Sequence, residues 1–529
     1  MSDLPFDWRL PYPSQRAPVL ADNLVATSQP LAVQAGLRIL QRGGNAIDAA
    51  VATAIALVVV EPTNNGVGSD AFAIVWDGHR LHGINGSGKS PTALDVSRIE
   101  VLGDMPSFGW DAVTVPGAVS VWAALSKRFG KLPFADLFAP AIHYAREGYA
   151  VAPITATQWQ MVEGLYQARS SFAEAFLPAG RAPHAGERFS LPALADTLEE
   201  IARTGGESLY RGRLAERIAT AARGDGADLA ASDLHDHQPL WVEPLFLDYR
   251  GWRVHELPPN GQGLATLIAL GILEHFPLGE MPADSAESLH LQIEAMKLAI
   301  ADTRRHVADP NQYHAPIERL LSRDYLAGRA AGIDPNQAHE VEAGGTLHGD
   351  TVYLTTADGD GRMVSYIQSN YFAFGSGIVV PASGISLQNR GACFTLEAGH
   401  PNRVAGGKRP FHTIMPGFLT KNGRAVMSFG VMGGPMQPQG HLQVVVRIVD
   451  NGENPQAAID APRWQVFDGL DVVVEQGMPT RTIEELMGRG HVVRYGDSAA
   501  FGGAQAIYRF DGGYLGASDP RKDGLAGGF

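Results

Sequence analysis

The chain opens with two segments whose apolar positions recur at helical spacing. Residues 30–42 predict one helix that ends at a pair of glycines, and residues 45–60 predict a second helix that ends before Pro62. The second helix includes an unbroken apolar run at 49–60, which is too short to span a bilayer and favours a buried helix. Its richness in alanine indicates close packing against a sheet.

Hairpin and strand patterns appear further along. Two apolar runs flank Asp77 and Gly78, a dipeptide typical of two-residue β-hairpin turns. The middle of the chain is mostly helical in pattern, with the clearest segments at 192–203, 213–223 and 286–307. The final third carries short alternating apolar runs separated by glycine and aspartate, which are typical of strands. We expect one α/β body that is helix-rich first and strand-rich later.

Charge and cysteine content narrow the class of protein. The 529 residues include 42 basic and 56 acidic ones, so the formal net charge is −14. Such a charge repels phosphate backbones and argues against nucleic acid or an anionic membrane as a partner. Cys393 is the only cysteine, which excludes an intrachain disulfide. The N-terminal segment lacks the charged start and apolar stretch of a secretory signal, so we expect a cytoplasmic protein.

One octapeptide matches a nucleotide-binding pattern. Residues 83–90 read GINGSGKS, which fits the phosphate-binding loop G-x-x-x-x-G-K-[ST]. In a nucleotide-binding protein that loop follows a parallel strand and opens a long helix. Here the preceding strand belongs to an antiparallel hairpin, and the residues after Ser90 allow only a short helix. A nucleotide-dependent enzyme therefore remains an alternative of a different class, which loss of both ATP binding and activity in a Lys89→Ala variant would favour.

Six stretches of the chain carry a more specific signal. They are GGNAIDAAVATAIALVVVEPTNNGVGSDAF (43–72), VTVPGAVSVW (113–122), PPNGQGLATLIALGILE (258–274), GDTVYLTTADGDG (349–361), GKRPFHTIMP (407–416) and the ending GASDPRKDGLAGGF. Together, and in this order, they resemble the γ-glutamyltranspeptidase family of N-terminal nucleophile hydrolases. The resemblance runs from about residue 20 to the C-terminus. It implies a four-layer αββα sandwich, in which two antiparallel sheets pack face to face with helices outside.

In that family the precursor cuts itself before a threonine, which becomes the N-terminal nucleophile of a small subunit. The matching position is Thr351, after Asp350, so the resemblance implies a large subunit of residues 1–350 and a small subunit of residues 351–529. The two fragments would form one αββα body as a heterodimer, with a dimer of heterodimers left open. A free α-amine suits this chemistry because it supplies a base for the hydroxyl of the same residue. Before cleavage the same oxygen can attack the Asp350 carbonyl and give an ester that water resolves.

Two further features of an acyl-transfer site match the family. Ser369 lies where the family has a second threonine, whose hydroxyl contacts the amine of the nucleophile. Gly433 and Gly434 match the paired-glycine loop whose backbone N–H groups stabilise the tetrahedral oxyanion. A non-enzymatic, unprocessed binding protein is the weaker alternative, because it has no need of this whole set.

The residues that bind the γ-glutamyl group in the family are replaced here. The arginine that grips the α-carboxylate matches Ser87, so the octapeptide is expected to line the acyl pocket. The aspartate that meets the α-amine matches Cys393, so both ionic contacts are missing. The other replacements are Arg390 for a glutamine, Tyr371 for an asparagine, and His412 and Thr413 for paired serines.

These replacements change the expected substrate. Two charge-assisted contacts contribute about 1.5–3 kcal/mol each, so glutathione is not the substrate we expect. The QNRG and IQS pieces instead resemble the oxamate amidohydrolase branch, whose members release ammonia from a very small amide acid. Arg390 suits bidentate binding of a substrate carboxylate, with a structural salt bridge as the alternative. The hypothesis is that Thr351 attacks a small carboxylate-bearing amide. A γ-glutamyltransferase or glutathione hydrolase and a glutaryl-type acylase remain alternatives within the family.

Neither a metal nor an organic cofactor is expected. His290 and Glu294 share a face of the helical segment 286–307, but the HExxH spacing and a third ligand are lacking. Both are interpreted as helix-surface residues. The expected partners are the small amide substrate and the two cleavage fragments themselves.

Overall fold

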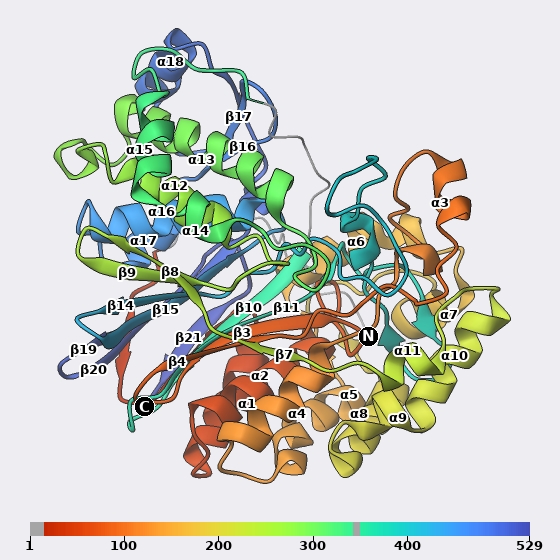
Figure 1. Cartoon of the computed structure of the whole chain (residues 1–529). Coiled ribbons are helices and arrows are strands. Elements are labelled where there is room, and N and C mark those ends of the chain that lie inside the picture. The colour runs from red at the N-terminus through yellow and green to blue at the C-terminus, as the bar shows by residue number, and fades with distance from the viewer. Residues whose placement is uncertain (1–14, 342–349) are drawn as a thin grey trace.

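Two seven-stranded antiparallel sheets form the centre of the molecule, as Figure 1 shows. The computed structural model describes residues 15–341 and 350–529. The first sheet, here the β10 sheet, has the order β21 (Leu525–Gly528), β2 (Leu24–Thr27), β10 (Asp350–Ala357), β11 (Met363–Tyr371), β3 (Asp70–Trp76), β4 (Leu81–Asn85) and β7 (Leu240–Val242). The second, the β15 sheet, has the order β1 (Val19–Ala21), β20 (Gly513–Ser518), β19 (Gly503–Phe510), β15 (Arg424–Met432), β14 (Gly417–Lys421), β9 (Trp252–Glu256) and β8 (Leu245–Tyr249).

The two sheets pack face to face through an apolar layer. Alternate residues of a strand point to opposite faces of its sheet, so Tyr353 faces the other sheet while Val352 and Leu354 face helices. Phe418 and Ile507 of the β15 sheet belong to the same buried layer as Tyr353. Because both faces of the central strands are covered, every residue of β3 and β11 is buried.

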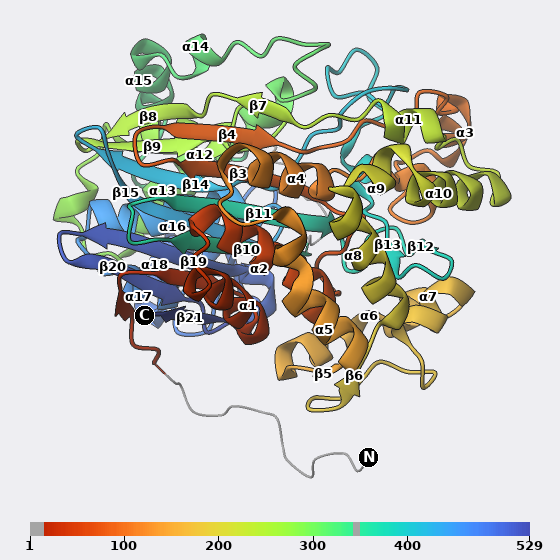
Figure 2. The ribbon, with the colours of Figure 1, turned by 90° about the horizontal axis from the view of Figure 1, so that it is seen from below.

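Helices cover the outer face of each sheet, which completes four layers. The helices over the β10 sheet are α1 (Pro30–Gln41), α2 (Ala46–Val60), α4 (Ala118–Phe129), α5 (Ala139–Glu147) and α8 (Pro192–Thr204), on the side seen in Figure 2. Those over the β15 sheet are α12 (Leu264–Leu273), α13 (Ala286–His306), α16 (Met436–Val449) and α17 (Pro455–Asp460). The expected αββα sandwich is confirmed.

Smaller elements complete the fold at the edges. The helices are α3 (Val96–Leu102), α6 (Pro153–Tyr166), α7 (Ser170–Phe176), α9 (Glu207–Arg211), α10 (Arg213–Gly224), α11 (Ala231–His235), α14 (Ile317–Leu320), α15 (Arg323–Ala331) and α18 (Thr480–Gly488). The short strands are β5 (Tyr149–Ala150), β6 (Arg188–Phe189), β12 (Val379–Val380), β13 (Ile385–Ser386), β16 (Trp464–Val466), β17 (Asp471–Val474) and β18 (Val492–Tyr495). Among the described helices, none combines the length and the apolar character needed to cross a membrane.

The predicted helices and hairpin are present, with one difference at the turn. The β3 and β4 strands pair antiparallel, but they are joined by residues 77–80 rather than by two residues. The Asp77 carboxylate accepts hydrogen bonds from the backbone N–H groups of His79 and Arg80, which closes this wider turn. The hairpin prediction is confirmed, and the turn length was wrong.

Segments on both sides of residue 350 share one sheet. Strands β10 and β11 lie between β2 and β3, which come from the first part of the chain, as Figure 1 shows in green beside red and orange. The two parts of the chain are therefore interleaved in one body. This arrangement places Thr351 near the end of a central strand, where β10 meets β11.

Candidate active site

An irregularity between β10 and β11 positions Thr351. Asp350 pairs with Tyr371 and Val352 pairs with Gln368, so the register shifts by one residue between these pairs. Such bulges re-aim side chains and are common beside active sites. Here the Thr351 hydroxyl, on a residue that is 2% exposed, donates a hydrogen bond of 3.2 Å to the Ser369 Oγ. The two hydroxyl residues predicted to act together are therefore in contact.

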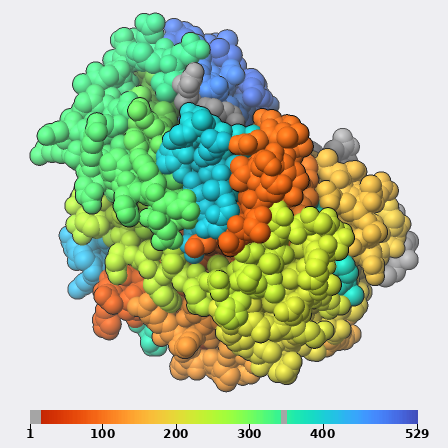
Figure 3. Space-filling view, turned by 45° about the vertical axis from the view of Figure 1, so that its right-hand side comes forward, coloured from red at the N-terminus to blue at the C-terminus, as the bar shows by residue number. Residues whose placement is uncertain are grey.

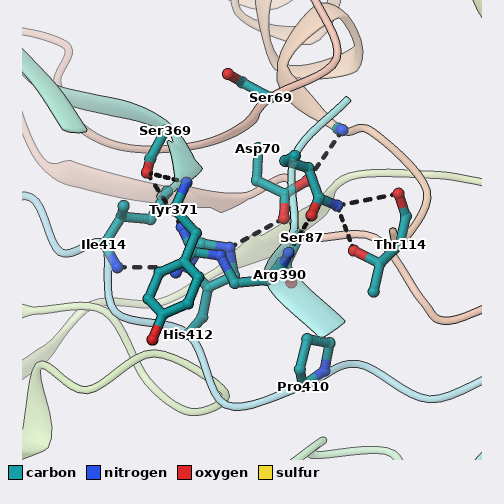
Figure 4. A network of polar contacts seen from close by, with 12 residues as sticks. Ser69, Asp70, Ser87, Thr114, Ser369, Tyr371, Arg390, Pro410, His412 and Ile414 are labelled. Atoms are coloured by element: carbon teal, nitrogen blue, oxygen red, sulfur yellow. Dashed lines mark hydrogen bonds and ion pairs between the residues drawn. The ribbon is translucent and has the colours of Figure 1, made fainter. Parts of the chain in front are cut away.

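Ser369 is held by two further donors. Its Oγ accepts the backbone N–H of Tyr371 at 2.8 Å and the Nη2 of Arg390 at 3.2 Å. Tyr371 adopts a positive φ of 78°, an uncommon conformation for a non-glycine residue that occurs often at functional sites. The Ser369 hydroxyl therefore joins the Thr351 oxygen to a cation, as Figure 4 shows for the Ser369, Tyr371 and Arg390 group.

Arg390 is a fully buried guanidinium held by neutral groups. Its Nη1 donates to the Thr413 Oγ1 at 2.7 Å and contacts the Cys393 sulfur at 3.9 Å, while the Tyr371 ring lies 4.7 Å from its Cζ. Among the described side chains, no carboxylate forms an ion pair with it, and its Nε has no hydrogen-bond partner. The structural salt bridge considered for Arg390 is thus not found within the described residues. A buried cation of this kind suits an anionic ligand.

A cavity of about 410 Å³ adjoins this group. Three residues around Arg390 (Tyr371, Cys393 and Thr413) line it, together with Pro435 and Arg304. Burial raises the pKa of the Cys393 thiol, so that side chain is neutral near pH 7. Burial likewise lowers the pKa of the half-buried Arg304, whose guanidinium forms no ion pair within residues 15–341 and 351–529. The cavity is therefore lined mainly by apolar groups, with Arg304 and Glu397 as charged residues of its wall.

His412 pairs with an acid that the sequence reasoning missed. Its Nε2 lies 3.0 Å from the Asp70 Oδ2, and both side chains are fully buried. Because the Ile414 N–H donates to His412 Nδ1, the ring carries its proton on Nε2 and donates to Asp70. Burial, followed by the Arg390 charge, keeps the pKa of His412 well below its usual range, so the ring is neutral. The sequence signal for Asp70 was its position as a single acidic residue at the start of an apolar strand.

The pKa of Asp70 gives a pH prediction. Burial raises that pKa to about 7, against the lowering effects of Arg390, Arg409 and two backbone N–H groups. The folded state therefore binds this proton more tightly than the unfolded chain, and the stabilisation is present at low pH and lost as the pH rises through about 7. Measured in an uncut Thr351→Ala background, the Tm of the native Asp70 protein should fall relative to that of Asp70→Asn between about pH 5 and about pH 8. A Tm difference that stays constant over this range would contradict the assignment.

The octapeptide of residues 83–90 does not form a phosphate cradle. Its backbone N–H groups are used internally: Gly86 donates to the Ala71 carbonyl, Ser87 to the Asn85 side chain, and Ser90 to the Lys408 carbonyl. The next helix, α3, begins only at Val96. The geometry required for a nucleotide-binding loop is therefore missing from this segment.

Ser87 lies apart from the large cavity. Its hydroxyl donates to the Asn85 Oδ1 at 2.7 Å and it is fully buried, so it packs beneath the Asp70 side of the site rather than along the cavity wall. Figure 4 shows it on the far side of Arg390 from Tyr371.

Gly433 and Gly434 lie beside the segment that carries His412 and Thr413. Gly433 and Gly434 have φ values of 118° and 56°, which glycine adopts readily, and a Cβ on Gly433 would lie 3.0 Å from the Gly502 Cα. The Gln262 side chain donates to the carbonyls of both Gly434 and Thr413. This amide joins the glycine turn to the segment that carries His412 and Thr413.

Two sequence predictions need comment. The surface interpretation of His290 and Glu294 was wrong, because both are buried. His290 hydrogen-bonds to His491 at 2.8 Å and Glu294 to Lys297 at 2.8 Å, since the segment after α15 and the α18 region cover this face of α13. His290, Glu294 and His491 lie close enough together to hold a metal ion. The Glu294 carboxylate, however, already forms an ion pair with Lys297. Gly349 and the side chain of Asp350, at the predicted cleavage point, lie outside the described residues.

Comparison with known proteins places the whole chain among relatives. The model of the family described as gamma-glutamyltranspeptidase matches residues 32–529. The chain is 37% identical over 526 residues to the glutathione hydrolase-like YwrD proenzyme of Bacillus subtilis (strain 168), covering 96% of this chain and 98% of that protein. It is also 37% identical over 533 residues to the oxamate amidohydrolase proenzyme of Klebsiella pneumoniae, covering 97% and 99% respectively.

A solved structure agrees with the fold over its full length. The crystal structure of cephalosporin acylase from Bacillus halodurans superposes with a TM-score of 0.95 at 48% sequence identity, covering 100% of this chain and 99% of that one. The similarity is therefore that of an entire protein rather than of one shared segment.

Proposed function

Because this chain belongs to the γ-glutamyltranspeptidase family, we propose that it is an autoprocessed amidohydrolase whose nucleophile is Thr351. Its relatives are hydrolases and acylases of amide C–N bonds, and two of them are named as proenzymes. Scission before Thr351 would give fragments 1–350 and 351–529. Its substrate is a small amide that carries a carboxylate close to the scissile carbonyl.

Maturation uses the Thr351 hydroxyl as its nucleophile. In the uncut chain its Oγ attacks the carbonyl carbon of Asp350, the hydroxyl proton passes to the peptide nitrogen as the C–N bond breaks, and the acyl group moves from nitrogen to oxygen. Water then hydrolyses the ester, which leaves a carboxylate on Asp350 and a free α-amine on Thr351. The hydrogen bond to Ser369 supports this step because it orients the Thr351 oxygen beside the bond to be cut.

Catalysis then repeats the attack on a substrate. The Thr351 α-amine accepts the hydroxyl proton, the oxygen adds to the amide carbon, and the N–H groups of Gly433 and Gly434 stabilise the oxyanion. The leaving nitrogen takes the proton as the C–N bond breaks and the ester forms. Water, deprotonated by the same amine, releases the acid and restores the hydroxyl.

The observation that carries the substrate proposal is the buried guanidinium one hydroxyl away from the nucleophile. Arg390 and Thr351 contact the same Ser369 oxygen, each at 3.2 Å. A carboxylate bound by Arg390 would therefore lie within a short carbon chain of the carbonyl under attack, as it does in oxamate. A γ-glutamyl group carries its charges farther from the scissile bond, and Ser87 and Cys393 give it no ionic partner.

A second candidate is an acylase for larger amides of the glutaryl type. The cavity of about 410 Å³ beside Thr413 and Cys393 has space for far more than an ammonia leaving group, and Arg304 at its wall could pair with a further anion. The relative with the same fold over its full length is named a cephalosporin acylase.

A substrate panel separates these proposals. The purified protein is assayed with oxamate, glutaryl anilide and γ-glutamyl anilide, and kcat/KM is compared. Loss of two charge-assisted contacts should lower kcat/KM for the γ-glutamyl compound by at least about a hundredfold relative to oxamate. Preference for glutaryl anilide would favour the second candidate, and preference for γ-glutamyl anilide would defeat both.

A further inference from the structure

A second cavity lies behind the loop of residues 85–91, away from the nucleophile. It has a volume of about 260 Å³, and its lining includes Lys89, Ser90, His237 and Arg409. None of the residues of the Thr351, Ser369 and Arg390 group lines it. Figure 3 shows the surface in this part of the molecule, where the orange segment after residue 85 meets the cyan segment that ends near residue 410 above the yellow-green 230s.

Arg409 supplies a buried cation to this cavity. The residue is 4% exposed, its Nε donates to the Ser87 carbonyl at 3.0 Å, and its backbone N–H donates to the Asp309 carboxylate. Within the described residues, neither of its two Nη groups has a hydrogen-bond or ion-pair partner, and the side chain lines the cavity. A guanidinium in this state presents four N–H donors to whatever enters.

One further cation, Lys89, and a neutral histidine, His237, line the same space. Lys89 is an exposed lysine without an ion pair in the described parts of the chain. The His237 Nε2 donates to the Ser120 Oγ at 3.0 Å, because the Ser120 proton is itself given to the Gly117 carbonyl. Burial, then the charges of Arg409, Arg211 and Lys89, lowers the pKa of His237 to about 3, which agrees with a positive field around it.

The acidic residues of the lining form no ion pair with Arg409 or Lys89. Both Asp233 oxygens accept backbone N–H groups, from Thr92 and from Ala230, so the carboxylate is engaged at the start of α11. The Asp236 side chain is 81% exposed and pairs with His235. Neither carboxylate contacts Arg409 or Lys89.

We propose that this cavity is a binding site for a small oxyanion, held by the Nη groups of Arg409 and by Lys89. The shared chemistry is that of phosphate, as the free ion or as the end group of a small phosphate ester, since the volume exceeds that of one phosphate group. The octapeptide thus contributes a lysine side chain to an anion site, although its backbone N–H groups are used elsewhere. This site is independent of the proposed cleavage and hydrolysis.

Phosphate binding to the full-length purified protein tests the proposal. Inorganic phosphate is titrated by calorimetry at constant ionic strength, with chloride as the balancing salt. One saturable site of roughly millimolar affinity is expected. Lys89→Gln should weaken it about threefold to tenfold, and should fold normally because Lys89 is exposed.

The matched control is Lys127→Gln, which removes an exposed lysine at the end of α4, outside the cavity lining. It should bind phosphate as the native protein does. Arg409→Lys, provided its Tm shows a folded protein, should weaken binding more than Lys89→Gln, since the paired donors are lost. Glycerol phosphate in a parallel titration identifies the source: tighter binding indicates an ester, and equal binding the free ion. No saturable binding, or equal affinities for the native protein and Lys89→Gln, would overturn the proposal.

Discussion

Thr351→Ala is expected to give a single uncut chain of 529 residues without amidase activity, whereas the native protein should run as fragments of 350 and 179 residues. The substitution removes the oxygen that attacks both the Asp350 carbonyl and the substrate, while the methyl side chain still fits the buried site. Removal of a nucleophile lowers kcat by at least about a thousandfold. Denaturing electrophoresis and intact-mass spectrometry read the first effect, and a rate assay the second.

Two variants control this experiment. Thr351→Ser keeps the hydroxyl and should be cut and active, with lower rates because serine lacks the β-methyl that restricts χ1. Thr355→Ala removes a threonine hydroxyl from the same strand, where it bonds to Ser428 rather than to Ser369, and should be cut normally. Two results would contradict the proposed function: full activity in an uncut native chain, and normal cleavage of Thr351→Ala.

Arg390→Met is expected to abolish the preference for carboxylate-bearing amides without lowering stability. A lost charge-assisted bidentate contact corresponds to about 1.5–3 kcal/mol, so kcat/KM for oxamate should fall about tenfold to a hundredfold or more. The methyl ester of oxamate, which lacks the charge, should be affected far less. The ratio of the two kcat/KM values is therefore the measurement.

The Tm of Arg390→Met distinguishes a substrate-binding role of Arg390 from a structural role. If Arg390 formed a buried ion pair, its loss would leave an unpaired charge and cost about 3–5 kcal/mol. Within the described residues its hydrogen-bond partners are neutral, and the nearby Asp70, whose pKa is about 7, is protonated at about pH 5. At that pH, replacement by an apolar side chain of similar length should leave the Tm unchanged or raise it. A large drop in the Tm of Arg390→Met, with the substrate preference intact, would assign the side chain to the fold.

The sequence predicted local patterns and failed on contacts between distant segments. Helix α2 follows from its apolar run and its Asn45 cap, and the proximity of Thr351 and Ser369 follows from two adjacent strands joined by a short turn. The contact between Asp70 and His412 joins residues 342 positions apart, so only the packing of the two sheets reveals it. The burial of His290 similarly depends on α18, which arrives near the end of the chain.

Arg390 illustrates the same limit within the site. Its identity suggested a carboxylate ligand, but its partners come from two separate segments: Ser369 and Tyr371 on β11, and Thr413 before β14. Side chains from loops converge only when the strands beneath them are in register. The spacing of apolar residues along the sequence does not predict which segments meet at Arg390.

The interleaving of β10 and β11 between β2 and β3 affects how the protein would refold after cleavage. In the precursor, every strand of that sheet belongs to one polymer, so renaturation is a first-order event independent of dilution. If the proposed scission before Thr351 takes place, recovery of the sheet from denaturant would require two separate polypeptides to associate. The yield of refolding should then depend on protein concentration. The cleaved protein would keep its native structure only while its two fragments stay associated.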